Sequence, residues 1–237
     1  MGEPFSGIKT GLTSVLVISK QKMDDLSTDR LRCRELFRSW ITGDDVGRWE
    51  AEGATRFIIF IPKGWTREKY GSGTEEELWV QFERDYGSVA NWLFQSKGAL
   101  KSRSDKGDFW WELRACDYYD KFESELILYP EMSQGPKFCR KRGAAITNNK
   151  TFMLDTLRYD ILAYLNSRAA WFLLSGICTS LRGGKWRLEL RADYCNCSRP
   201  FGHAGIGRGF AARVNRMASR ARRERRRAVS TTERMSA

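Results

Sequence analysis

The chain has 237 residues, of which 41% are apolar and 13% aromatic, enough to bury a core in one large domain or two small ones. Its formal net charge of +12 indicates a polyanionic partner, but eleven of the 41 basic residues and only two of the 29 acidic ones lie in residues 198–237. Residues 1–197 therefore carry 30 basic and 27 acidic residues, which excludes a uniformly basic domain and leaves nucleic-acid binding to local patches.

The first half of the chain mixes strand and helix patterns. Residues 7–12 are predicted to form turns, and residues 13–19 a strand. Residues 27–40 have the apolar spacing of a helix, and residues 56–61 form the clearest buried strand. Thr74 followed by Glu77 predicts a capping box at the start of a helix through about Arg84, and a second helix is expected after Gly87.

The second half continues without a repeated strand–helix–strand unit. Strands are predicted at residues 124–129, 138–139, 151–154 and 186–190, with a basic turn at 140–143 and a helix at 159–175. Irregular alternation of this kind favours an α+β fold, with a mixed, mainly antiparallel sheet and several packed helices. Residues 198–237 contain no Leu, Trp or Tyr, and we predict a disordered Arg-rich tail there.

The sequence gives no sign of a membrane or a metal. The N-terminus lacks the charged and apolar regions of a signal peptide, and the longest apolar run, residues 169–174, is too short to span a bilayer. We therefore expect a cytoplasmic protein with no membrane partner and with its six cysteines as thiols. Cys195 and Cys197 with His203 lack the paired spacing of a structural zinc site, so no metal is predicted.

Residues 101–114 are the most informative segment. They place Lys101, Arg103, Lys106 and Arg114 around a tryptophan pair and end in Trp-Trp-Glu-Leu-Arg. Basic side chains can bind phosphates and guanine edges, and indole rings can stack on bases or anchor the loop that carries the cations. A polar loop followed by a core strand would explain the same residues, and the segment alone favours neither interpretation.

No catalytic centre is apparent. The chain has no Pro-Pro dipeptide, so it lacks the Asp/Asn-Pro-Pro-aromatic loop that holds a flipped base. The glycine cluster at residues 205–209 follows no strand, and the single histidine, His203, leaves no His-based triad. We predict that this chain alone is not an enzyme and binds no cofactor.

Six segments, taken in order, resemble the TaqI-like C-terminal specificity domain of adenine-N6 DNA methyltransferases and fused restriction–modification enzymes. They are residues 7–12, 41–49, 57–62, 103–114, 126–131 and 164–168. The resemblance covers roughly residues 7–197. It implies residues 1–26 as a linker and first strand, 27–197 as the DNA target-recognition domain, and 198–237 as a basic tail that departs from the family pattern.

In that family, a preceding methyltransferase domain binds S-adenosylmethionine and receives the flipped adenine, while the specificity domain clamps double-stranded DNA and reads bases. The resemblance therefore implies that this chain is the recognition half only. It also implies a separate methyltransferase subunit, or a missing N-terminal domain, as the site of S-adenosylmethionine.

The resemblance also assigns roles to residues. Lys9, Thr10 and Gly11 lie in the junction near DNA; Arg103 and Arg114 would contact phosphate or guanine; and Trp110 and Trp111 would support the loop, with at most one touching DNA. For the remaining residues a structural role is the alternative. Asp44 and Arg48 would contact DNA or form a mutual salt bridge, and the turn of Thr147, Asn148, Asn149 and Lys150 would read bases or be an ordinary hairpin turn. Asn166 and Ser167 would form a helix end.

Two other interpretations stay open. The Arg-rich tail fits a non-catalytic RNA-binding protein of ribonucleoprotein assembly, and deleting residues 198–237 would then abolish binding. The abrupt change of composition at Ser198 fits out-of-frame translation, and with it a degenerate gene fragment.

Overall fold

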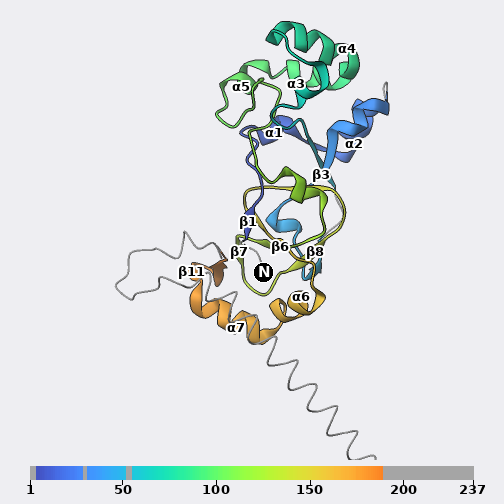
Figure 1. The fold of residues 1–237 in the computed structure, drawn as a ribbon. Helices are drawn as coiled ribbons and strands as arrows, with labels where there is room; N and C mark the ends of the chain where they lie inside the picture. Colours follow the sequence, from blue (N-terminus) through green and yellow to red (C-terminus); the bar gives the residue numbers. More distant parts are fainter. Residues whose placement is uncertain (1–3, 29–30, 52–54, 189–237) are drawn as a thin grey trace, which may run out of the picture.

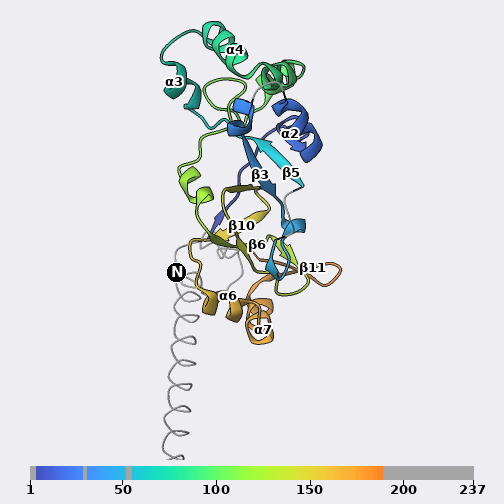
Figure 2. The same cartoon turned by 90° about the vertical axis from the view of Figure 1, so that its right-hand side faces the viewer.

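A computed structural model describes residues 4–28, 31–51 and 55–188. Figures 1 and 2 show helices α3 and α4 at one end of the molecule and α6 and α7 at the other, with the main strands between them. This arrangement confirms the predicted α+β class. The predicted disordered tail, residues 198–237, and the Cys195, Cys197 and His203 group lie outside the described residues.

The helices and strands have these bounds. The α-helices are α1 Thr13–Leu16, α2 Lys20–Ser27, α3 Trp65–Tyr70, α4 Glu75–Phe94, α5 Lys97–Ser102, α6 Tyr159–Leu165 and α7 Arg168–Ile177. The 3₁₀ helices are η1 Leu31–Leu36, η2 Gly43–Asp45 and η3 Tyr119–Glu123. The strands are β1 Phe5–Ser6, β2 Val17–Ser19, β3 Phe37–Ile41, β4 Trp49–Glu50, β5 Arg56–Ile59, β6 Leu126–Pro130, β7 Met132–Ser133, β8 Cys139–Lys141, β9 Ala145–Thr147, β10 Thr151–Leu154, β11 Thr179–Leu181 and β12 Lys185–Arg187.

The strands form three sheets, in the orders β1-β10-β6-β8-β4, β2-β5-β3-β9 and β11-β12-β7. Pairing is antiparallel except between β3 and β9 and between β4 and β8. Strand β1 pairs with β10 and β2 pairs with β5, so the first residues of the chain are built into two sheets with strands far along the sequence.

Strand β6, at the centre of the five-stranded sheet, is buried on both faces. Side chains alternate along a strand, and in β6 Leu126 and Leu128 belong to one apolar cluster while Ile127 and Tyr129 belong to the other. The second cluster is completed by helices α6 and α7. Burial on both faces explains why β6 is apolar throughout rather than alternating.

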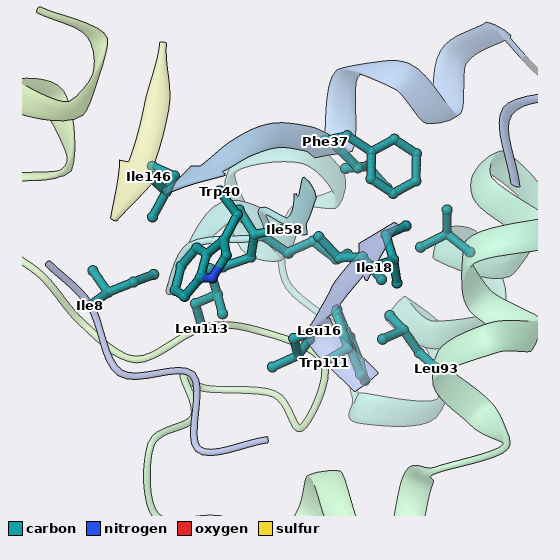
Figure 3. Packing of buried hydrophobic residues seen from close by; sticks show 14 of the residues in the cluster. Ile8, Leu16, Ile18, Phe37, Trp40, Ile58, Leu93, Trp111, Leu113 and Ile146 are labelled. Carbon is teal, nitrogen blue, oxygen red and sulfur yellow. The ribbon is translucent and has the colours of Figure 1, made fainter. Parts of the chain in front are cut away.

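The larger cluster continues from this sheet into the helical end of the molecule. Figure 3 shows Ile8, Trp40 and Ile146 at one side of it and Leu93 of helix α4 at the other, with Trp111 between. Helix α4 begins with the predicted capping box, in which Thr74 and Glu77 exchange hydrogen bonds with each other's backbone N–H. Tyr86 interrupts it with non-helical dihedral angles (φ −131°, ψ 41°), so α4 consists of two helical segments divided next to Gly87, as the sequence predicts.

Two sequence predictions were wrong in the N-terminal region. Residues 13–19 are not a strand throughout, because Thr13–Leu16 forms a helical turn before β2. Residues 27–40 do not form a helix: the 3₁₀ turn Leu31–Leu36 leads into Phe37–Ile41, which pairs with β5 and β9. Pairing on both sides of a central strand overrides the local helical spacing.

The C-terminal elements follow the sequence more closely. The predicted helix at residues 159–175 is divided into α6 and α7 by Asn166 and Ser167. The Ser167 hydroxyl accepts a hydrogen bond from the N–H of Ala170 at 3.1 Å and so caps α7. The assignment of Asn166 and Ser167 to a helix end is therefore confirmed. In the described part of the chain, no helix has both the length and the apolar character that crossing a bilayer requires.

Candidate nucleic-acid interface

Arg103 lies inside the tryptophan loop and is only 6% exposed. Its guanidinium donates hydrogen bonds to the carbonyls of Thr10 at 2.6 Å and Trp110 at 3.0 Å, and also to that of Glu112. Burial lowers the pKa of Arg103 to about 10, which still leaves it charged at neutral pH. The guanidinium holds the loop to the junction segment and is not available to DNA in this conformation.

Glu112 holds the same loop from the other side. Its fully buried carboxylate accepts hydrogen bonds from the N–H groups of Thr66 at 3.1 Å, Asp108 at 2.9 Å and Phe109 at 3.4 Å. These donors come from helix α3 and from the loop itself, so one carboxylate ties the two together. Such charge-assisted bonds are stronger than those between neutral groups.

The tryptophan pair belongs to the core. Trp110 is 2% exposed and Trp111 is fully buried, and both rings lie against Trp79 of helix α4, with centroids 4.5 and 5.1 Å away. The Trp111 indole N–H donates to the hydroxyl of Thr66 at 3.0 Å. Trp110, predicted among the DNA contacts, is thus a core residue here, and its ring offers no free face to a base.

Arg114, at the other end of the loop, is exposed. Its guanidinium pairs with the Asp105 carboxylate at 3.0 Å, the local acidic partner that the sequence offers. Asp105 in turn lies against Gly11, where a Cβ would come within 3.1 Å of the Asp105 Cβ. Gly11 has a φ of +70°, so it serves both the turn and this close contact.

The junction segment also contacts the polar turn at residues 147–150. Ile8 forms a bridge with Asn148, and a Cβ on Gly7 would collide with the Thr147 and Asn148 carbonyls. Lys9 is exposed, and no carboxylate of the described residues pairs with it. Thr10 is 4% exposed and hydrogen-bonds Thr13 through their hydroxyls at 2.9 Å, so Thr10 has a structural contact instead of a free hydroxyl.

Within the polar turn, only part of the predicted set reaches the surface. Thr147 is fully buried, with its hydroxyl 3.7 Å from the Met153 sulfur. The Asn148 side-chain oxygen accepts from Thr151 at 2.8 Å and shapes the turn. Lys150 is exposed and pairs with Glu131 at 2.8 Å.

Asp44 and Arg48 are both exposed, and no ion pair joins them among the described residues. Asp44 follows Gly43, where a Cβ would come within 3.2 Å of the Pro130 Cβ and 3.4 Å of the Lys150 carbonyl oxygen. Arg48 donates to the Asn166 carbonyl at 2.7 Å. The neighbouring Asp45, in contrast, pairs with Arg56 at 2.7 Å.

Trp49 is a feature that the sequence reasoning missed. It is 43% exposed and has a φ of +83°, a backbone region that a bulky residue rarely adopts. The Arg48 guanidinium lies 5.5 Å from the centroid of its ring. Its place at the end of the 41–49 segment was the available signal, since an aromatic residue beside a cation is typical of nucleic-acid interfaces.

Several of the predicted residues thus lie along one series of neighbouring segments. It runs from Arg114 through Gly11 and Lys9 to the polar turn, and from there to Asp44. The exposed members are the cations and the Asp44 carboxylate, which can bind phosphates and base edges. In the residues that the structure describes, no three His, Cys, Asp or Glu side chains gather as a metal site.

We compared the chain with known proteins to find which of them share its fold. No family model and no curated protein matches the chain. Among solved structures, the chain is similar to MmeI, a type IIL restriction–modification enzyme in complex with DNA, with a TM-score of 0.54 and 14% identity over 79% of this chain. The match spans 23% of the MmeI chain. The protein therefore shares its fold with part of a restriction–modification enzyme.

Proposed function

We propose that the chain is a DNA target-recognition module of a restriction–modification or adenine-specific DNA methyltransferase system, of the TaqI-like specificity type. The likeness to part of a DNA-bound restriction–modification enzyme carries the proposal. Contacts between the family-like segments support it: residues 103–114 contact 7–12 and 57–62, and residues 41–49 contact 164–168. The methyl donor and the catalytic loop would come from a preceding methyltransferase domain or from a separate methyltransferase subunit.

The DNA-contacting residues of this module are the exposed ones. Lys9 would bind a phosphate, and Arg114 would exchange Asp105 for a phosphate or for the O6 and N7 atoms of guanine. Asp44 could accept from a cytosine amino group, and Trp49 could stack on an unpaired base. Arg103, Trp110, Thr10 and Thr147 would hold these residues in place from inside the fold.

The decisive measurement is sequence preference, because the Arg-rich tail supplies affinity for any nucleic acid. The full chain would be tested by fluorescence anisotropy against a library of duplexes and against RNA of equal length. We expect one preferred duplex sequence, and Arg114→Ala to cost about 1–3 kcal/mol on that duplex while relaxing preference at one position. The control, Arg182→Ala, removes an exposed cation from a hairpin remote from the series and should change nothing.

The result contradicting the proposal is equal affinity for all duplexes, or tighter binding of RNA, by the full chain. Every variant retains the same tail, so its contribution cancels in each comparison. The proposal also predicts no transfer of labelled methyl from S-adenosylmethionine to DNA by this chain alone. A labelled duplex in that assay would show that the chain carries its own catalytic site.

A further inference from the structure

Helix α7 has two apolar faces, and the described part of the chain covers only one of them. Ala170 and Leu174 on the inner face are buried, and Leu174 belongs to the smaller apolar cluster, against which Trp171 and Cys178 also pack. Figure 1 shows α7 at the end of the molecule, remote from helices α3 to α5. Among the described residues, it is the inner face that fixes the helix to the domain.

The outer face is a continuous apolar stripe. It consists of Ala169, Phe172, Leu173, Gly176 and Ile177, which follow one another at the i, i+3, i+4, i+7, i+8 spacing of a helix face. Phe172 is 77% exposed, Leu173 39% and Ile177 49%. Single exposed apolar residues are ordinary, but an ordered stripe of them on one helix is typical of a protein–protein contact.

The exposed charged residues at the start of α7 and in the hairpin that follows it are basic, and we call Arg168, Arg182, Lys185 and Arg187 the basic border. Arg168 begins the helix, and the β11–β12 hairpin that follows it carries Arg182, Lys185 and Arg187, all exposed. Within the described part of the chain, only Arg187 has a carboxylate partner, Glu131, at 3.6 Å. Glu131 is itself only 5% exposed, so it offers little negative charge to an approaching surface.

We propose that the outer face of α7 binds an amphipathic helix of a second protein, whose apolar side is bordered by acidic residues. The stripe supplies apolar burial, and the basic border supplies charge complementarity and orientation. Gly176 has nothing within 4 Å of the position of a Cβ, so a partner helix can approach the backbone closely there.

The same charges argue against the other occupants. A second copy of this chain would bring one basic border against another, and residues 198–237 of this chain have eleven Arg against two acidic residues. DNA would meet the basic border but leave the apolar stripe without a partner. The proposal goes beyond the recognition function and does not depend on it.

The test uses three fluorescent helical peptides and the full chain. The first peptide has an apolar stripe at i, i+3, i+4 and i+7 bordered by Glu, the second has the same stripe bordered by Lys, and the third keeps the Glu but replaces the stripe with Ser. Anisotropy titration should show binding of the first peptide, with the second and third at least tenfold weaker. The third peptide reports the attraction between Glu and the Arg-rich tail alone.

The variants locate the contact. Phe172→Glu should weaken the first peptide at least tenfold. Val80→Glu changes a similarly exposed residue on α4, 62% exposed, and should bind the first peptide like the unmodified chain. Circular dichroism of both variants should match the unmodified chain, because neither side chain contributes to the core.

Three outcomes would overturn the proposal: equal binding of the first and third peptides, equal binding of the first and second, or no loss of binding in Phe172→Glu. A chain that is dimeric by light scattering and becomes monomeric on Phe172→Glu would identify a second copy as the occupant instead. Loss of DNA sequence preference is a separate readout. If the unmodified chain shows no preference among duplex sequences, the recognition function is refuted and the peptide result stays intact.

Discussion

Two basic stretches of the chain each place one cation inside the fold and another at its surface. In the tryptophan loop Arg103 is buried on backbone carbonyls, whereas Arg114 is exposed and pairs with Asp105. In the 139–143 segment Lys141 is fully buried, whereas Arg140 pairs at the surface with Glu125. The interior cations organise backbone, and the exposed ones are free to exchange partners.

The difference shows what a cluster of basic residues can indicate. Spacing around aromatic residues places a cation near an aromatic core but does not decide whether the cation meets phosphate or carbonyl oxygen. Phosphate oxygens are anionic and carbonyl oxygens carry a partial negative charge, so both accept hydrogen bonds from a basic side chain. The carbonyl role belongs to the cation whose side chain faces inward, as Lys141 does in strand β8, two residues after the buried Cys139.

The largest expected effect is on the interior cation of the tryptophan loop. Arg103→Ala leaves three carbonyls without their donor inside the fold, and we expect a loss of about 3 kcal/mol or more in the free energy of unfolding. Urea denaturation followed by tryptophan fluorescence measures it. Arg114→Ala, the matched exposed cation, should cost less than about 1 kcal/mol. Equal losses would remove the distinction between the two.

A somewhat smaller loss is expected from the carboxylate that faces Arg103 across the loop. Glu112→Gln places an amide group where an oxygen accepts from backbone N–H groups, and we expect about 2 kcal/mol of destabilisation. The exposed Glu83 on α4 provides the control, and Glu83→Gln should stay within about 0.5 kcal/mol of the unmodified chain. An unaffected Glu112→Gln would mean that the loop is held by its aromatic packing alone.

Much of the fold could be predicted where local patterns agree with the final pairing. The buried strand at 56–61, the strand at 124–129 and the capping box at Thr74 are each specified by their own residues. The strand at Phe37–Ile41 and the strand Ala145–Thr147 could not be predicted, because their identity depends on pairing with each other across more than a hundred residues.

The candidate site divides in the same way. The segments could be predicted, because Gly, Asn and charged residues mark loops and turns. The sequence could not predict which side chains of a segment face outward. Thr10, Arg103 and Thr147 face inward because they pack against residues remote in sequence. Trp49 lies outside by virtue of a backbone conformation that no pattern predicts.

The pH dependence of stability tests the second interior cation, Lys141. Lys141 donates to the carbonyls of Phe122, Ser124 and Gly143 at 2.6, 2.8 and 2.5 Å, and burial lowers its pKa to about 8. Its folded-state pKa is then below the unfolded value of about 10.4, so the unfolded chain binds the extra proton between these values. Stability should therefore rise with pH from about 8 upward.

The measurement is the difference in unfolding free energy between the unmodified chain and Lys141→Met, which cancels the tyrosines. It should increase by up to about 1.4 kcal/mol per pH unit within that window and stay flat below pH 8. Lys137→Met, at an exposed lysine, should give a flat difference throughout. A flat difference for Lys141 as well would mean that its three carbonyl partners hold the proton against burial.

The smallest expected effect concerns Lys9, and it tests whether an exposed cation binds a phosphate. If Lys9 binds one phosphate, Lys9→Ala should weaken all duplexes about equally and reduce the slope of log affinity against log salt by about 0.9. Stability should change by less than about 0.5 kcal/mol, because no described carboxylate pairs with Lys9. Lys185→Ala, an exposed lysine in the hairpin beside α7, is the control and should leave the slope unchanged. A slope that responds equally to both would assign the salt dependence to diffuse charge, and the exposed cations would then have no defined phosphate contact.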